Sequence, residues 1–247
     1  MSWFRKTIVQ SLALTGGFLA GLQGHTEAAQ APAADRTVIA DWPYVNHDTY
    51  GTRYSALSAI NTTNAGKLHR VCSYAFPEKE PSQTAPVVIS GVIYASTAHY
   101  TVALDGYDCH LLWAHRWQPR GPEPFNTQRG VALANGRVVR GTADSYLLAL
   151  DASDGHPIWA RSIADSREGY FISMPPLVED GLIYIGPAGA EWASSGWVGA
   201  FRPTDGEEVW RFRIVPADGE PGRRDLGKGS RCTQARGRKS MDGAVVR

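Results

Sequence analysis

Cysteine, net charge and helical periodicity are all scarce in this 247-residue chain. The three cysteines, Cys72, Cys109 and Cys232, form no C-x-x-C motif, which excludes a zinc ribbon and an attached c-type haem in this chain. In an exported protein an odd count leaves at least one cysteine unpaired. The formal net charge of +1 argues against a nucleic-acid partner, because such partners select basic surfaces. No segment beyond the N-terminus shows a helical hydrophobic period, so we expect an all-β protein.

The N-terminus carries the pattern of an export signal. Arg5 and Lys6 precede an apolar stretch from Ile8 to about Leu22, and small residues follow at Ala28, Ala29 and Ala31. This order predicts a signal peptide over residues 1–31 and no integral membrane span after its cleavage. The stretch is short for a membrane span and contains polar and glycine residues, although an uncleaved anchor is the alternative.

A repeat of 45 residues dominates the remaining sequence. Dipeptides suited to tight turns occur between apolar runs at Ser90-Gly91, Asn135-Gly136 and Asp180-Gly181, and each hairpin is followed by a segment that ends in tryptophan: Trp113, Trp159 and Trp210. Asn-Gly and Asp-Gly supply the positive φ angles of a two-residue type I′ turn. Four expected strands per period predict the four-stranded blades of a β-propeller.

The patterned region bounds the expected domains. We expect a partial propeller over residues 32–217, and its roughly 190 patterned residues correspond to about four blades. Such a chain is either a small or assembled ring or the front part of a larger one. Residues 218–247 are basic and glycine-rich without the repeat, which predicts a disordered tail or one foreign to the fold. A segment that binds an acidic partner is the alternative for this tail.

Several motifs resemble the quinoprotein alcohol dehydrogenases of the methanol and ethanol dehydrogenase type. They are DWP at 41–43, GTRYSALSAIN at 51–61, and above all IGPAGAEWASSGWVGAF at 185–201. The resemblance runs from about Asp41 to Pro221 and covers roughly the first half of a family member. It implies an eight-bladed periplasmic propeller that uses pyrroloquinoline quinone (PQQ) and Ca²⁺. The segments ending in tryptophan look like that family's docking motifs, which join neighbouring blades.

The same resemblance implies a set of site residues. Glu191 stands at the family's calcium-binding carboxylate, and carboxylate oxygens suit this hard cation. Arg129 matches the arginine that binds the acidic groups of the quinone, for which a guanidinium is well shaped. The remaining implied cofactor contacts are Gln83, Ser173, Gly189 and Ala190. Taken singly, each has a plain alternative, such as a solvated carboxylate for Glu191 or a surface charge for Arg129.

The chain also departs from the family pattern. The two adjacent cysteines that often precede the arginine are absent from PEPFNTQRG, Ala188 replaces a common serine, and Cys72 stands near a family tryptophan. The family's catalytic aspartate and its asparagine ligand of calcium lie beyond the matched region. The resemblance therefore assigns no catalytic residue here, and we expect a truncated form with an incomplete catalytic site.

The resemblance implies a reaction and its partners. The expected enzyme is a periplasmic oxidoreductase that oxidises primary alcohols with PQQ and calcium and passes electrons to a cytochrome c or similar acceptor. Two alternatives stay open: a non-catalytic propeller with PQQ-type repeats that binds proteins, and a relative of the quinoprotein glucose or sugar dehydrogenases.

Overall fold

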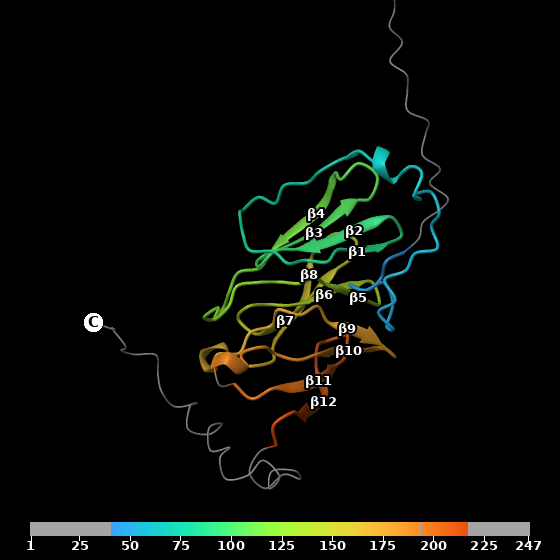
Figure 1. The fold of residues 1–247 in the computed structure, drawn as a ribbon. Coiled ribbons are helices and arrows are strands. Elements are labelled where there is room, and N and C mark those ends of the chain that lie inside the picture. Colours follow the sequence, from blue (N-terminus) through green and yellow to red (C-terminus); the bar gives the residue numbers. More distant parts are fainter. Residues whose placement is uncertain (1–40, 193, 217–247) are drawn as a thin grey trace, which may run out of the picture. The chain divides into compact units, whose positions relative to one another are not determined.

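The protein is built from three four-stranded antiparallel sheets (Figure 1). The computed structural model describes residues 41–192 and 194–216. The first sheet comprises β1 (Val87–Ile89), β2 (Val92–Ser96), β3 (Tyr100–Asp105) and β4 (Leu111–Arg116). The second comprises β5 (Ala132–Ala134), β6 (Arg137–Gly141), β7 (Tyr146–Asp151) and β8 (Pro157–Ser162). The third comprises β9 (Leu177–Glu179), β10 (Leu182–Ile185), β11 (Trp197–Phe201) and β12 (Glu208–Arg213).

This architecture confirms the prediction of an all-β chain with four-stranded repeats. The helical segments in the described part are three 3₁₀ turns: η1 (Ala65–Lys67), η2 (Ser166–Glu168) and η3 (Ala190–Trp192). No helix in this part is long and apolar enough to cross a membrane. The predicted signal peptide and basic tail lie outside the described residues.

The number of sheets differs from the sequence-based expectation. The described residues hold three sheets, whereas the length of patterned sequence predicted about four. The difference arises before β1, because residues 41–86 contain isolated bridges and η1 but no regular strand. This stretch is rich in aromatic and turn-forming residues and adds to the length from which four blades were expected, but the repeated hairpin pattern begins only after it.

Each sheet begins with the hairpin that the sequence predicts. Asn135 and Gly136 have φ angles of 49° and 73°, and Asp180 and Gly181 have φ angles of 48° and 73°. These left-handed values are those of a type I′ turn, whose twist matches that of the flanking strands. The turns set the register, so that Ala134 pairs with Arg137 immediately across the hairpin.

Tryptophan residues connect neighbouring sheets. The Trp113 Nε1–H donates to the Ala152 carbonyl at 3.0 Å, and the Trp159 Nε1–H donates to the Pro203 carbonyl at 2.9 Å. A Cβ at Gly155 would lie 2.5 Å from the Trp113 ring, and one at Gly206 would lie 2.6 Å from the Trp159 ring. Only glycine leaves room for the indole at these positions. The family-derived expectation of docking tryptophans is thus confirmed at two interfaces.

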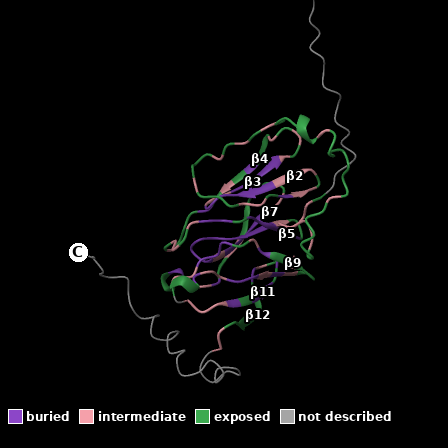
Figure 2. Cartoon of the chain, in the orientation of Figure 1, coloured by how far each residue is buried: buried purple, intermediate pink, exposed green. Residues whose placement is uncertain are grey.

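Both faces of β7, in the second sheet, are buried. Along β7, Leu147 and Ala149 point into a core shared with the third sheet, whereas Leu148 and Leu150 point into a core shared with the first. This follows from the alternation of side chains along a strand. Figure 2 shows the resulting concentration of buried residues in the middle of the molecule. By contrast, all six residues of β12 are exposed.

Candidate functional site

The predicted site residues lie at one end of the sheets. In an antiparallel sheet with neighbours in chain order, the start of the first strand and the turn between the second and third strands share an end. Gln83, Arg129 and Ser173 precede β1, β5 and β9, and Gly189 to Glu191 lie between β10 and β11. The fold therefore brings all six residues to the same end of the strands, which we call the loop end.

The segments leading into the three sheets are hydrogen-bonded to each other in sequence order. The Gln83 N–H donates to the Gln128 carbonyl at 3.0 Å, and the Arg129 N–H donates to the Ser173 carbonyl at 2.9 Å. The Arg129 side chain continues this connection, since its Nε donates to Gln83 Oε1 at 3.2 Å and its Nη1 donates to Ser173 Oγ at 2.8 Å. Three of the predicted residues thus form one polar cluster.

Gly189 and Glu191 reach the same region through a separate contact. Ala188, next to Gly189, forms an isolated antiparallel bridge with Phe171. Phe171 stands two residues before Ser173, so this bridge brings the two segments together. Gly189 has a φ of 122°, and a Cβ there would lie 2.3 Å from the Gly169 carbonyl oxygen. Glycine is therefore required where these backbones approach. Ala190 and Glu191 are exposed in η3, and the Glu191 carboxylate has no hydrogen-bond or ion-pair partner among the described residues.

An aromatic cluster that the sequence analysis did not identify lies beside this turn. Phe171 packs against Trp192 with ring centroids 5.3 Å apart and against Phe125 at 5.5 Å. Phe125 and Trp192 are 47% and 43% exposed, so each offers an open apolar surface. Phe125 stands in the PEPFNTQRG stretch that lacks the family's adjacent cysteines.

The three side chains before Arg129 each contain a buried oxygen atom without a partner. The Asn126 Oδ1, Thr127 Oγ1 and Gln128 Oε1 atoms make no hydrogen bond with any residue that the structure describes. The amide nitrogen of Gln128, in contrast, donates to the Ile172 carbonyl at 2.6 Å. Buried polar oxygens without partners cost free energy unless water or a ligand satisfies them. The NTQ stretch therefore presents unused hydrogen-bonding capacity at the loop end.

A charged network occupies the loop end of the first sheet. His99 lies between two carboxylates, with Nδ1 2.5 Å from Glu80 Oε1 and Nε2 2.9 Å from Glu123 Oε1. Burial alone would lower the pKa of His99, but these hydrogen bonds outweigh it and raise the pKa. Arg140 is fully buried nearby, which lowers its pKa to about 10. The sequence analysis did not predict this network. The one local signal for it is the charged Arg140 at the end of the apolar run Val138-Val139.

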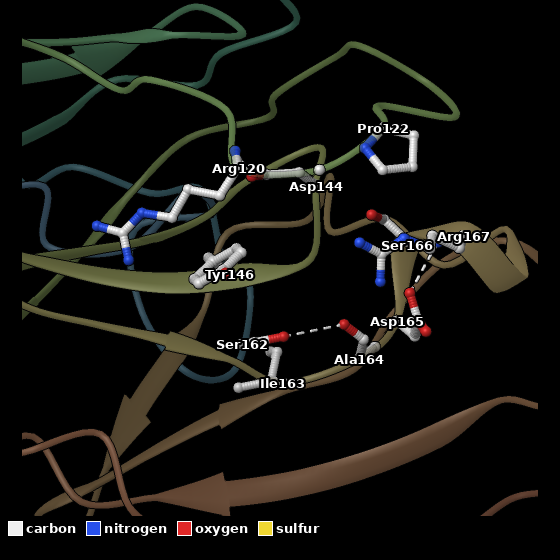
Figure 3. Close-up of a pocket in the computed structure, with 11 residues that line it drawn as sticks. Arg120, Pro122, Asp144, Tyr146, Ser162, Ile163, Ala164, Asp165, Ser166 and Arg167 are labelled. Carbon is white, nitrogen blue, oxygen red and sulfur yellow. Dashed lines mark hydrogen bonds between the residues drawn. The ribbon is translucent and has the colours of Figure 1, made fainter.

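A cleft of about 400 Å³ also opens at the loop end (Figure 3). Arg120, Asp144 and Tyr146 form part of its lining, together with residues around η2. Figure 3 shows Arg120 extended beside Tyr146, and its guanidinium lies 5.2 Å from the Tyr146 ring centroid. None of the six predicted site residues lines this cleft.

The described residues hold one group of three potential metal ligands, and it lies elsewhere. Asp105, at the end of β3, and Asp108 and His110, in the turn that follows, offer ligand atoms within 4.8 Å of one another. The same residues form the turn itself, because Asp108 accepts hydrogen bonds from the His110 backbone and ring. Glu191 is not part of this group.

Comparisons with known proteins agree with this architecture. A model of the PQQ family, described as the glucose/ethanol/alcohol dehydrogenase β-propeller domain, matches residues 42–237. The quinohemoprotein alcohol dehydrogenase of Comamonas testosteroni is 33% identical over 209 residues, which are 77% of this chain and 30% of that protein. The quinoprotein alcohol dehydrogenase PedH of Pseudomonas putida is 31% identical over 84% of this chain and 35% of its own length.

Solved structures give the same relationship. The crystal structure of the Comamonas testosteroni enzyme superposes on 72% of this chain and 28% of its own chain with a TM-score of 0.68 and 33% identity. A europium-containing methanol dehydrogenase covers 74% of this chain and 33% of its own with a TM-score of 0.66 and 27% identity. The chain thus spans about a third of the length of these relatives. It belongs to the PQQ-dependent glucose/ethanol/alcohol dehydrogenase family of β-propellers.

Proposed function

We propose that this chain forms part of a periplasmic PQQ-dependent alcohol dehydrogenase and supplies one side of its cofactor site. The observation that carries the proposal is the polar cluster of Gln83, Arg129 and Ser173 at the loop end. The names of the similar proteins support alcohol oxidation. The name of one of them, a 1-butanol dehydrogenase of Thauera butanivorans, includes cytochrome c. We extend a small primary alcohol as substrate and a cytochrome c as acceptor to this chain on that basis.

The described residues fit PQQ by their chemistry. PQQ is a planar, acidic molecule, and the Arg129 guanidinium can donate to a carboxylate while Gln83 and Ser173 hold its orientation. The partnerless oxygens of the NTQ stretch can accept hydrogen bonds from the cofactor or from ordered water. Gly189 allows the backbone to approach closely, and the exposed rings of Phe125 and Trp192 offer flat apolar surface.

One described residue, Glu191, supports the proposal that this chain binds calcium. Glu191 offers an exposed carboxylate that has no competing partner among residues 41–192 and 194–216, which suits a hard cation. Ca²⁺ takes about six to eight oxygen ligands, so Glu191 would supply only part of its coordination shell. We propose Glu191 as a calcium ligand on this ground together with its place in the G-A-E-W motif.

The division of chemical roles follows from these residues. PQQ, when bound, supplies the redox chemistry that removes two electrons from the alcohol. Arg129 binds and orients the cofactor's acidic groups, and Ser173 and Gln83 position the guanidinium. The exposed rings beside η3 would shield the bound cofactor from water at the loop end. We assign no proton-transfer residue within the described part of the chain.

The test is a PQQ titration in the presence of CaCl₂, followed by the fluorescence of the chain's eight tryptophans. Arg129→Ala removes charge-assisted hydrogen bonds of about 1.5–3 kcal/mol, so we expect PQQ to bind about 10- to 150-fold more weakly. Arg120→Ala is the matched control, because Arg120 is an exposed arginine in the cleft that the predicted residues do not line.

Either of two results would contradict the proposal. The unaltered chain could fail to bind PQQ at concentrations up to the millimolar range, which would remove the cofactor site from this part of the protein. Alternatively, both arginine variants could lose affinity equally. Equal losses would show that general positive charge, rather than the cluster around Arg129, attracts the acidic cofactor.

A further inference from the structure

Cys109 occupies a position that is glycine in the other two sheets. Cys109, Gly155 and Gly206 each end the same turn before the fourth strand, and the N–H of each donates to the carbonyl four residues earlier, at 3.0, 2.9 and 2.9 Å. Their φ angles are 60°, 75° and 70°. A left-handed conformation is unfavourable for cysteine, so the turn geometry that the three sheets share, rather than local preference, sets this backbone.

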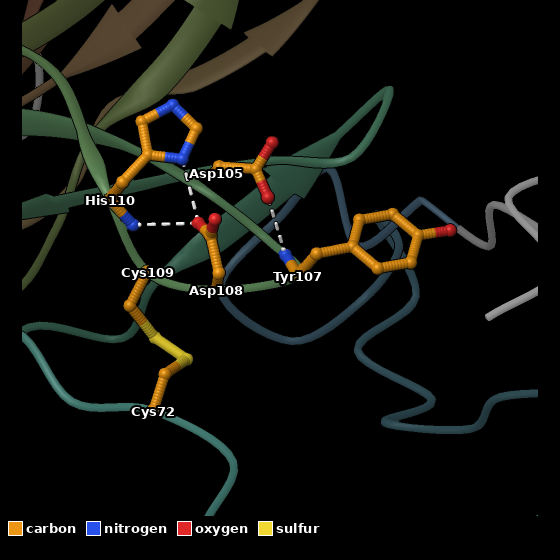
Figure 4. Close-up of a disulfide and its surroundings, with 6 residues drawn as sticks. All are labelled: Cys72, Asp105, Tyr107, Asp108, Cys109 and His110. Carbon is orange, nitrogen blue, oxygen red and sulfur yellow. Dashed lines mark hydrogen bonds and ion pairs between the residues drawn. A yellow bond between two sulfur atoms is a disulfide. The ribbon is translucent and has the colours of Figure 1, made fainter. Parts of the chain in front are cut away.

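The group that packs against this turn in the first sheet differs from the group in the other two sheets. In the second and third sheets, Gly155 and Gly206 receive the rings of Trp113 and Trp159 from the preceding sheet. In the first sheet, Cys109 forms a disulfide with Cys72, across a sequence separation of 37 residues (Figure 4). The disulfide of the first sheet therefore occupies the place that a tryptophan ring packed against glycine occupies in the second and third sheets.

The segment that contains Cys72 lies against the first sheet like a strand of a neighbouring sheet. Cys72, Tyr74 and Phe76 are half-buried, whereas Ser73 and Ala75 between them are exposed. Tyr74 and Phe76 pack on a cluster of three residues of the first sheet: Ala95, Val102 and Leu104. Val102 and Leu104 point away from the second sheet, because Ala103 between them belongs to the core shared with it.

The disulfide replaces a large apolar contact with a small covalent one. A docked tryptophan buries about 150–250 Å² by itself, and a cysteine side chain cannot provide this area. Once the sulfur–sulfur bond is broken, the Tyr74 and Phe76 contacts remain, together with the exposed ion pair of Glu78 with Arg116 at 3.0 Å, two residues beyond the segment. Exposed ion pairs contribute about 0–1 kcal/mol, so these contacts hold the segment weakly. Both cysteines are partly exposed, so a thiolate can reach them.

We propose that the Cys72–Cys109 disulfide is a redox-dependent latch that takes the place of tryptophan docking and holds segment 72–76 on the first sheet. A dithiol reductant breaks the sulfur–sulfur bond. It donates two electrons and two protons, leaves Cys72 and Cys109 as thiols, and is itself oxidised to a disulfide. Reduction releases the segment and uncovers the apolar face formed by Val102 and Leu104. The inference does not depend on PQQ binding.

The test is limited chymotrypsin digestion of the full chain with and without dithiothreitol. Chymotrypsin cleaves after aromatic residues, and release of the segment exposes Tyr74 and Phe76. We expect reduction to raise the rate of cleavage at these two residues at least about tenfold, since local proteolysis follows the population of the opened state. Cleavage after Trp113, which stays docked, serves as the internal measure of an intact fold.

Variants separate the latch from other effects of reductant. Cys232→Ser should keep the response to dithiothreitol, whereas Cys72→Ser with Cys109→Ser should be cleaved rapidly in both conditions. Cys72→Trp with Cys109→Gly recreates the contact of the other sheets and should be protected in both conditions. Continued protection of the double serine variant, or of the reduced unaltered chain, would overturn the proposal.

Discussion

Substitution of Gly155 by alanine tests whether tryptophan docking joins the first and second sheets. A Cβ at Gly155 would lie 2.5 Å from Cε3 and 2.7 Å from Cδ2 of Trp113, atoms in the body of the ring. The indole therefore has to move. Trp113 is only 7% exposed, and its Nε1–H donates to the Ala152 carbonyl at 3.0 Å. Both the burial and the hydrogen bond depend on the present ring position.

The matched control is Gly136→Ala. Gly136 has a φ of 73° against 75° for Gly155, so alanine meets similar backbone strain at both positions, about 1 kcal/mol. A Cβ at Gly136 meets no atom within 4 Å. The difference between the two variants therefore isolates the contact with Trp113. We expect Gly155→Ala to lose an additional ~2–4 kcal/mol of unfolding free energy, from a displaced aromatic ring and a broken hydrogen bond.

Urea unfolding followed by circular dichroism measures this difference. With a slope of about 2 kcal/mol per molar urea, an additional loss of ~3 kcal/mol lowers the midpoint of Gly155→Ala by ~1.5 M relative to Gly136→Ala. Equal midpoints for the two variants would refute the reasoning, because they would show that strain alone, and not docking, determines the cost.

Two further predictions concern charges at the loop end. The pKa of His99 is raised in the folded state, because the bonds to Glu80 and Glu123 outweigh burial. Its stabilising contribution is therefore present below about pH 6.5 and is lost as the pH rises through the folded pKa. His99→Gln should flatten the fall in the urea midpoint above pH 6.5, and an unchanged slope would contradict this account. Asp144 is buried and accepts hydrogen bonds from an indole N–H, a backbone N–H and a hydroxyl. Asp144→Asn should cost about 2–3 kcal/mol of unfolding free energy in the same assay, and more than Asp165→Asn at the exposed start of η2, whereas equal costs would argue against a role for burial.

The candidate site follows in part from the sequence period. Gln83, Arg129 and Ser173 each stand three or four residues before the first strand of a sheet. Because successive repeats place equivalent positions side by side, their approximate spacing of 45 residues already predicts that they meet. The partnerless oxygens of the NTQ stretch could not be predicted, since whether a polar atom is paired depends on the segments that cover it.

The sequence by itself determined the hairpins and the four-stranded sheets, and the family resemblance added the docking of Trp113 and Trp159. Turn conformation and side-chain alternation are local properties, written in dipeptides such as Asn135-Gly136 and in the residues around them. Only the tertiary structure decided which cysteines pair, because Cys72 and Cys109 become neighbours only when an irregular segment folds back onto the first sheet. It likewise decided the burial of Arg140 and the position of His99 between two carboxylates. These features depend on contacts between separate elements, which no local pattern specifies.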